Sequence, residues 1–174
     1  IQPLQVEEPG SHYVIVLRMR DEQGALVSPD LFIAAAERYG LISNIDRWVV
    51  EHAFRWLVSE ADERERLALC SINLSGASLA DNEFLPFVIR QFQRSGLDAS
   101  KICFEITETA AIASFAQASR FINALKELGC KFALDDFGTS LSSFGYLKHF
   151  PVDYLDIDGS FVKEILHDPI DREM

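Results

Sequence analysis

The sequence predicts an α/β fold built on a parallel sheet. Strand-like and helix-like segments alternate along its 174 residues, a pattern that indicates right-handed βαβ units. The first long strand pattern, Tyr13 to Met19, is apolar except for Arg18, as is typical of a strand covered on both faces. No stretch rich in Pro, Gly or Ser separates two halves of the chain, so we expect one domain over residues 1–174.

The other elements are predicted from Pro and Gly residues that begin or end helices and from the spacing of apolar residues. After a charged loop over residues 20–28, Pro29 in its favoured early position opens a helix that runs to Arg38 and ends before Gly40. Gly96 and Gly129 mark the ends of two later helices. The remaining predicted elements are helices over 44–59, 84–94 and 115–128, strands over 67–74, 102–106, 131–134 and 154–157, a loop over 135–143 leading to a short helix that ends at 149, and a helix from 161.

Composition excludes several classes of partner. The chain has 16 basic and 27 acidic residues, a formal net charge of -11, whereas binding a nucleic-acid polymer requires clustered Lys and Arg. No stretch approaches the roughly 18 apolar residues of a membrane-spanning helix, so we expect no membrane contact by this segment. The cysteines Cys70, Cys103 and Cys130 are odd in number and lie in apolar surroundings, which indicates buried reduced thiols and a cytoplasmic location.

Polar side chains follow or end the predicted strands. They are Asn73, Glu105, Asp135, Asp136 and Asp156, and the carboxyl ends of parallel strands form the ligand-binding edge of such folds. Carboxylate and amide oxygens are ligands for Mg²⁺, Mn²⁺ or Ca²⁺, and two adjacent aspartates could each hold a different ion. A single Asp after a strand is also a common helix N-cap or turn former, so spacing alone leaves both readings open.

Several sequence blocks together resemble the EAL domain of bacterial cyclic di-GMP phosphodiesterases. The blocks are Asn73-Leu-Ser, Glu105-Ile-Thr-Glu108, Asp135-Asp136-Phe-Gly-Thr and Leu155-Asp-Ile-Asp158-Gly-Ser-Phe, preceded by Gln2-Pro3 and the strand that contains Arg18. The resemblance implies a modified TIM (β/α)₈ barrel whose first strand runs antiparallel to the others. It also implies hydrolysis of one phosphodiester bond of cyclic di-GMP to linear pGpG, with two Mg²⁺ or Mn²⁺ ions.

The resemblance also implies roles for individual residues. Asn73, Glu105 and Asp135 would be metal ligands, and Asp136 would serve the second metal and its water. Glu108 would organise the loop after Asp136, which in the family couples the metal site to dimerisation.

The opening segment supplies the ligand contacts that the resemblance implies. These are Gln2 and Arg18. The planar fork of an arginine suits it to grip a phosphate oxygen.

Three departures from the family pattern bear on function. The signature Glu, a metal ligand, is Val14, and the Lys expected near the attacking water is Asp156. The Gly expected after Thr139 is Ser140. A full barrel needs about 250 residues, so we expect an incomplete barrel in which the last two βα units are absent from this chain.

These departures favour a catalytically impaired EAL-type module that acts as a receptor or as a regulatory and interaction domain. An active metal-dependent phosphodiesterase yielding pGpG is one alternative, and a dimerisation scaffold that binds no nucleotide is another. The expected partners are cyclic di-GMP and either a second copy or a partner domain in a longer multidomain or membrane-anchored chain.

Overall fold

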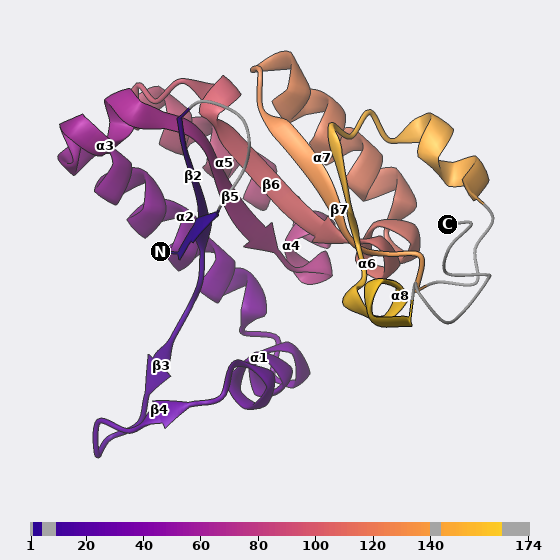
Figure 1. The fold of residues 1–174 in the computed structure, drawn as a ribbon, viewed down its shortest axis with the longest axis horizontal. Helices are drawn as coiled ribbons and strands as arrows, with labels where there is room; N and C mark the ends of the chain where they lie inside the picture. The colour runs from indigo at the N-terminus through magenta and orange to yellow at the C-terminus, as the bar shows by residue number, and fades with distance from the viewer. Residues whose placement is uncertain (1, 5–9, 140–143, 165–174) are drawn as a thin grey trace.

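A curved six-stranded sheet forms the centre of the molecule (Figure 1). The computed structural model describes residues 2–4, 10–139 and 144–164. The strand order is β1-β2-β5-β6-β7-β8, and β1 pairs antiparallel with β2 whereas the other neighbours are parallel. The strands are β1 Gln2–Leu4, β2 Ser11–Ile15, β5 Leu67–Leu74, β6 Ile102–Thr107, β7 Lys131–Phe137 and β8 Tyr154–Ile157. The sheet curls as a half-barrel, as predicted for an incomplete (β/α)₈ fold.

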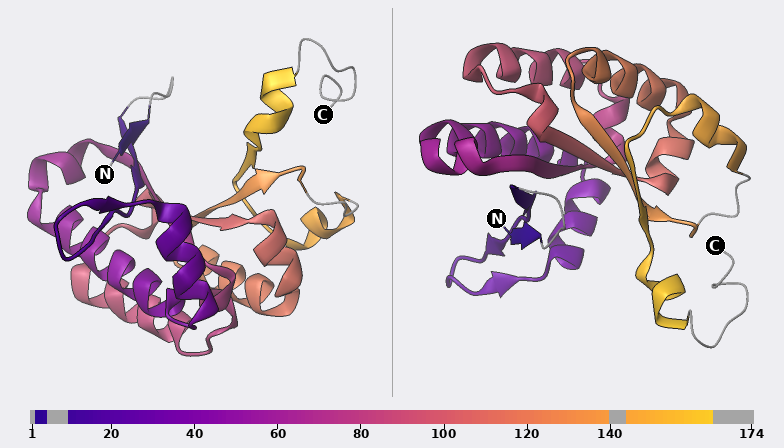
Figure 2. Two further views of the ribbon diagram at one scale, coloured as in Figure 1. Left: turned by 90° about the horizontal axis from the view of Figure 1, so that it is seen from below. Right: turned by 45° about the horizontal axis from the view of Figure 1, so that its top comes forward.

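Most of the helices cover the convex face of this sheet, whereas α1 and α8 lie beyond the ends of its strands (Figure 1 and Figure 2). The long ones are α1 Pro29–Arg38, α2 Ile42–Ser59, α5 Phe84–Ser95 and α7 Phe115–Glu127. The short ones are α3 Ala61–Arg66, α4 Gly76–Ala80, α6 Glu108–Ala113 and α8 Gly159–Glu164, with 3₁₀ turns η1 Ala99–Lys101 and η2 Phe144–His149. Gly96 ends α5 in the left-handed conformation with φ of 65°, where the absence of a Cβ removes the steric penalty.

Alternation of side chains along the central strands separates the core from the concave face. Ile72, Phe104 and Leu134 are fully buried against the helices. Because successive side chains of a strand point to opposite faces, the residues that follow them, Asn73, Glu105 and Asp135, belong to the concave face. The hydrophobic core therefore lies between sheet and helices, and the polar residues of the strands are gathered on the other side.

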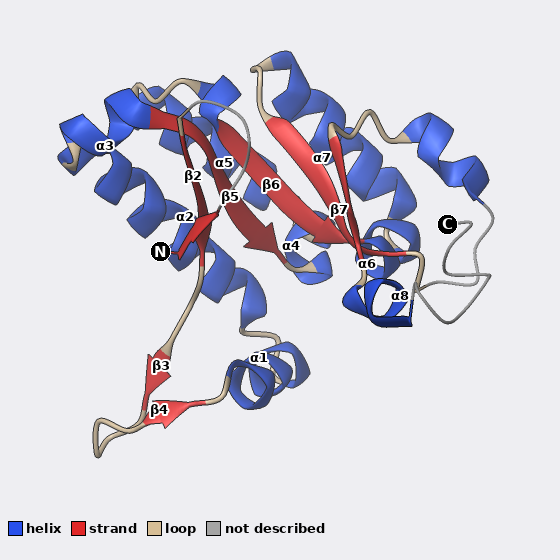
Figure 3. Cartoon of the chain, in the orientation of Figure 1, coloured by secondary structure: helices blue, strands red, loops and turns tan. Residues whose placement is uncertain are grey.

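The first long strand is shorter than predicted. β2 ends at Ile15, and the next three residues leave the sheet as irregular backbone. The predicted charged loop instead contains a two-stranded hairpin of β3 Met19–Arg20 and β4 Leu26–Val27, which stands beside α1 (Figure 3). The Asp21 carboxylate closes the turn of this hairpin by accepting hydrogen bonds from the backbone N–H of Gln23 and Ala25, at 3.0 and 2.8 Å. Hydrophobic patterning does not reveal such a side-chain-stabilised turn.

Other boundaries shift at the opposite end of the chain. β7 continues to Phe137, so Asp135 and Asp136 belong to the strand and the loop begins later than predicted. Residues 140–143 of that predicted loop lie outside the described residues. The last predicted helix begins at Gly159 rather than at residue 161.

The predicted state of the cysteines is confirmed. All three lie within the described residues, are buried and form no disulfide. In the described part of the chain, none of the helices combines the length and apolar character needed to cross a bilayer.

Candidate functional site

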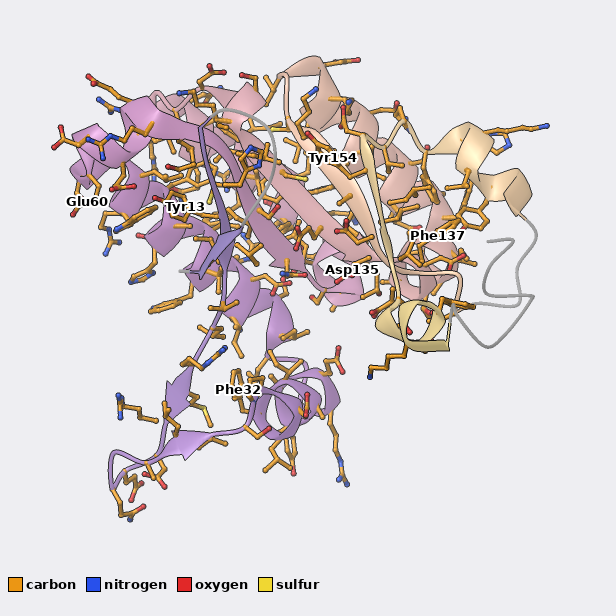
Figure 4. The ribbon with its side chains drawn as sticks, in the orientation of Figure 1. Tyr13, Phe32, Glu60, Asp135, Phe137 and Tyr154 are labelled. Carbon is orange, nitrogen blue, oxygen red and sulfur yellow. The ribbon has the colours of Figure 1, made fainter. Side chains whose placement is uncertain are left out.

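Strand register brings two predicted site residues side by side. Asn73 on β5 is the direct partner of Glu105 on β6, and Thr107 of β6 is the partner of Asp135 on β7. Paired residues on neighbouring parallel strands share a face of the sheet. The amide and the two carboxylates therefore lie at the carboxyl ends of three adjacent strands, where Figure 4 shows Asp135.

The carboxylates of this edge influence one another electrostatically. Burial raises the pKa of Glu105, the negative charges of Asp156 and Asp135 raise it further, and side-chain hydrogen bonds with Ser71 and Asn73 oppose that rise. The pKa of Asp156 on β8 is also raised, first by burial and then by the charge of Asp135. Three carboxylates from three neighbouring strands therefore share one negative environment, which a cation would stabilise.

Asp136 has a strained backbone. Its φ of 53° is the left-handed value that a residue with a side chain rarely adopts. The pairing of β7 with β8 shifts register between Leu134 and Phe137, as in a β-bulge, and bulges re-aim side chains next to active sites. Burial raises the pKa of the Asp136 carboxyl, and the charges of Asp135 and Asp158 add to that effect. The strained turn is stabilised locally, because the Asp136 backbone N–H donates to Asp135 Oδ1 at 2.8 Å.

Glu108 ties the loop after Asp136 to the helix that follows β6. It is the first residue of α6 and is only 1% exposed. Its Oε2 accepts a hydrogen bond from the backbone N–H of Gly138 at 3.0 Å, and its Oε1 accepts one from the Tyr146 hydroxyl of η2. Burial, together with the hydrogen bond and charge of Glu108, raises the pKa of Tyr146. One carboxylate thus joins α6 to two other segments, the loop after Asp136 and η2.

The opening segment places its predicted residues at different positions around this edge. Val14 pairs with Ser71 on β5 and with Gln2 on β1, and the side chain of Gln2 lies outside the described residues. Arg18 is exposed on the irregular segment after β2, where Nη1 donates to its neighbour Leu17 O at 2.8 Å. A cavity of about 330 Å³ is lined by both Arg18 and Asn73, so the predicted phosphate contact and a predicted metal ligand border the same space.

A metal cage of acidic side chains is not formed by the described residues. Among residues 2–4, 10–139 and 144–164, no three His, Cys, Asp or Glu side chains are placed to hold a metal ion. Asn73 is a donor of another type, and it borders Glu105 directly. By donor chemistry, the amide oxygen with the carboxylates of Glu105 and Asp135 fits a hard divalent cation.

Sequence reasoning missed a buried carboxylate beside the site. Asp46, on α2, is 6% exposed, and its Oδ2 accepts three hydrogen bonds from Ser75 and Ser78. Burial raises its pKa, and these hydrogen bonds oppose the rise. The available signal was an acidic residue between the apolar-face residues Ile45 and Val49 of a helix, a position where a charge is costly unless it has partners.

Comparison with known proteins now assigns the family. The model of the EAL domain matches residues 2–174. The chain belongs to the EAL family. It is 41% identical over 151 residues to the cyclic di-GMP phosphodiesterase PdeB of Shewanella oneidensis, covering 87% of this chain and 18% of that protein. It is 35% identical over 175 residues to the cyclic di-GMP phosphodiesterase PdeF of Escherichia coli K12, covering 99% of this chain and 23% of that protein.

Solved EAL structures have the same fold. The crystal structure of the FimX EAL domain from Pseudomonas aeruginosa bound to c-di-GMP matches with a TM-score of 0.85 and 33% identity, covering 95% of this chain and 66% of that one. The phosphodiesterase PaMucR in complex with c-di-GMP matches with a TM-score of 0.82 and 31% identity, over 94% of this chain and 66% of that one. This EAL chain thus spans about a fifth of the two curated relatives and two thirds of the two solved chains.

Proposed function

We propose that this EAL domain is a cyclic di-GMP receptor or interaction module whose catalytic apparatus is impaired. The observation that carries the proposal is the position of Asp156, a carboxylate electrostatically linked to Glu105 and Asp135. The resemblance to the family implies a lysine at this position. A carboxylate there repels the negative charge that develops on a phosphate during hydrolysis, whereas an ammonium group would stabilise it.

A divalent cation is part of this proposal. Mg²⁺ or Mn²⁺ would be held by Asn73, Glu105 and Asp135, and Asp136 would serve a second ion. When bound, such ions neutralise phosphate charge and activate water. Val14 stands where the family has a further carboxylate ligand, and its apolar side chain cannot coordinate an ion. The donor set therefore supports metal-assisted ligand binding better than it supports a complete two-metal centre.

The ligand would enter beside the irregular segment after β2. Arg18 is exposed, and the cavity that it lines extends to Asn73. Its guanidinium can donate two parallel hydrogen bonds to phosphate oxygens, and its positive charge offsets the acidic edge. Gln2, on the strand paired with Val14, would supply a further polar contact.

Calorimetry tests the receptor function directly. The protein is titrated with cyclic di-GMP in the presence of Mn²⁺, then in EDTA, and the Arg18→Ala variant is titrated in parallel. We expect binding that requires Mn²⁺ and weakens at least about tenfold without the guanidinium, a loss of one charge-assisted contact. Absence of heat at high micromolar ligand would overturn the receptor function.

An active phosphodiesterase is the second candidate, favoured by the presence of Asn73, Glu105, Asp135 and Asp136. Chromatography of cyclic di-GMP after hours of incubation with Mn²⁺ distinguishes the two functions. Accumulation of pGpG would establish catalysis and contradict the proposed impairment, whereas unchanged nucleotide supports it.

A dimerisation scaffold is the third candidate, and the exposed apolar side chains of β8, the last strand of the sheet in the described part of the chain, favour it. On β8, Leu155 is 43% exposed and Ile157 is 52% exposed. Exposed apolar side chains on such a strand offer a surface for pairing with another chain. Sedimentation of the protein with and without cyclic di-GMP measures its oligomeric state. A dimer whose formation does not depend on the nucleotide would favour the scaffold over the receptor.

A further inference from the structure

We propose that Asp46 is a positioning residue for Asn73, acting through the turn that joins β5 to α4. Its effect on ligand binding rests on the proposed function, whereas its effect on the turn does not. Asp46 lies on α2, outside the strands that carry the candidate ligands. It contacts the segment that begins two residues after Asn73.

Three hydrogen-bond donors of the turn contact one oxygen of Asp46. Asp46 Oδ2 accepts from the Ser75 backbone N–H at 2.9 Å, from Ser75 Oγ at 2.6 Å and from Ser78 Oγ at 2.6 Å. Ser75 Oγ in turn accepts from the Ser78 backbone N–H at 3.3 Å as the N-cap of α4. Ser78 has no exposed surface. This carboxylate is therefore an integral part of the turn, because its removal would leave buried donors without an acceptor.

The turn is held from its other side as well. A Cβ added at Gly76 would lie 3.1 Å from the Ala110 Cβ of α6, so the start of α4 passes close to that helix. Helices α2 and α6 thus confine the segment that follows Asn73. Leu74, between Asn73 and the turn, is 5% exposed and packs in the core. With Leu74 and Ser75 both fixed, the position of Asn73 beside Glu105 is set by packing and by Asp46 together.

Asp81 offers a matched control at the other end of α4. Its carboxylate also bridges to α2, accepting from Arg47 at 2.7 Å and from Ser43 at 3.1 Å. It is the C-cap residue of α4, on the side away from Asn73. Asp46→Ala and Asp81→Ala remove the acceptor oxygens and therefore both weaken the contact between α2 and α4, but only the first alters the turn after Asn73.

The experiment measures three properties of the two variants and the wild-type protein. Urea unfolding establishes that both variants fold and gives their stabilities. Amide hydrogen exchange at Ser75 and the side-chain amide resonance of Asn73, both recorded by NMR without ligand, report the turn. Calorimetry with cyclic di-GMP and Mn²⁺ reports binding. The milder variant Ser78→Ala, which removes one donor to Asp46, is carried through the same measurements in case Asp46→Ala does not fold.

We expect Asp46→Ala to accelerate exchange at Ser75 at least about tenfold and to shift the Asn73 resonance. We expect it also to weaken binding about tenfold, with Asp81→Ala within about twofold of wild type in each case. Equal effects of the two variants on Ser75 and Asn73 would overturn the positioning role. If the wild-type protein binds no cyclic di-GMP, the receptor function fails, and the NMR comparison still decides the role of Asp46.

Discussion

Replacement of Glu108 by Gln is expected to destabilise the domain by about 2 kcal/mol. The carboxylate is 1% exposed and accepts hydrogen bonds from Gly138 and Tyr146. Hydrogen bonds to a charged group contribute about 1.5–3 kcal/mol each. Glutamine keeps one acceptor oxygen and presents an NH₂ group in place of the other, so about one charge-assisted bond is lost. In a domain of this size, that loss lowers the melting temperature by about 4–8 °C.

Thermal and urea unfolding of Glu108→Gln measure this loss, and hydrogen exchange at the Gly138 amide locates it. The control is Glu127→Gln, which removes an exposed carboxylate from the last turn of α7 and should change stability by less than about 0.5 kcal/mol. If Glu108→Gln unfolds like this control and Gly138 exchanges at the wild-type rate, the carboxylate does not anchor the loop and the reasoning is wrong.

Three further predictions concern other parts of the domain. Burial opposes ionisation of Asp153, but hydrogen bonds from Lys126, the Phe132 backbone N–H and Lys131, with the charge of Lys126, together lower its pKa. Its contribution to stability is therefore complete above an unfolded-state pKa of about 3.9 and is lost as the pH falls from there through the lowered folded-state pKa. Asp153→Asn should therefore cost about 2 kcal/mol at pH 7 and less at pH 3 in urea unfolding; equal costs at both pH values would contradict this. Burial raises the pKa of Cys70 and Cys130 to about 12, so both should react with a thiol reagent at pH 8 at least about a hundredfold faster in urea than in the native protein, and rapid native labelling would disprove it. Val14→Glu should raise Mn²⁺ affinity about tenfold over the uncharged control Val14→Gln, and equal affinities would count against a metal site at this edge.

The parts of the fold that the sequence predicted well are those in which one pattern dominates. The strand over 67–74 matches β5 because the segment is mostly apolar and contains no Gly or Pro. Gly96 ends α5 near the predicted residue. The errors occur where short-range polar contacts decide the backbone. Asp21 folds the predicted loop over residues 20–28 into a hairpin, and β7 continues through the register shift around Asp136 into what was predicted as loop.

The same distinction applies to the candidate site. Asn73 and Glu105 could be placed at one edge from the sequence, since each ends a recognisable strand, and strand register does bring them side by side. Asp46 could not, because its partners Ser75 and Ser78 lie 29 and 32 residues further along the chain. A helix pattern identifies a buried position but not the distant donors that make a carboxylate acceptable there. The roles of these residues in binding stay predictions.

The two departures from the family pattern at this edge of the sheet, Val14 and Asp156, bear differently on metal binding and on catalysis. Relative to the family pattern, Val14 removes one negative charge, and Asp156 replaces a positive charge with a negative one, so the edge becomes more negative by one charge. By charge, a cation would still be attracted to the carboxylates of Glu105 and Asp135 beside Asn73. The charge that would stabilise the reacting phosphate is lost, however, and at about 4 Å and an effective dielectric of 20 it is worth about 4 kcal/mol, or roughly a thousandfold in rate. Under the proposed function we therefore expect binding and turnover to separate in this domain, because the substitutions would keep the attraction for metal and remove the cation that the family's catalysis uses.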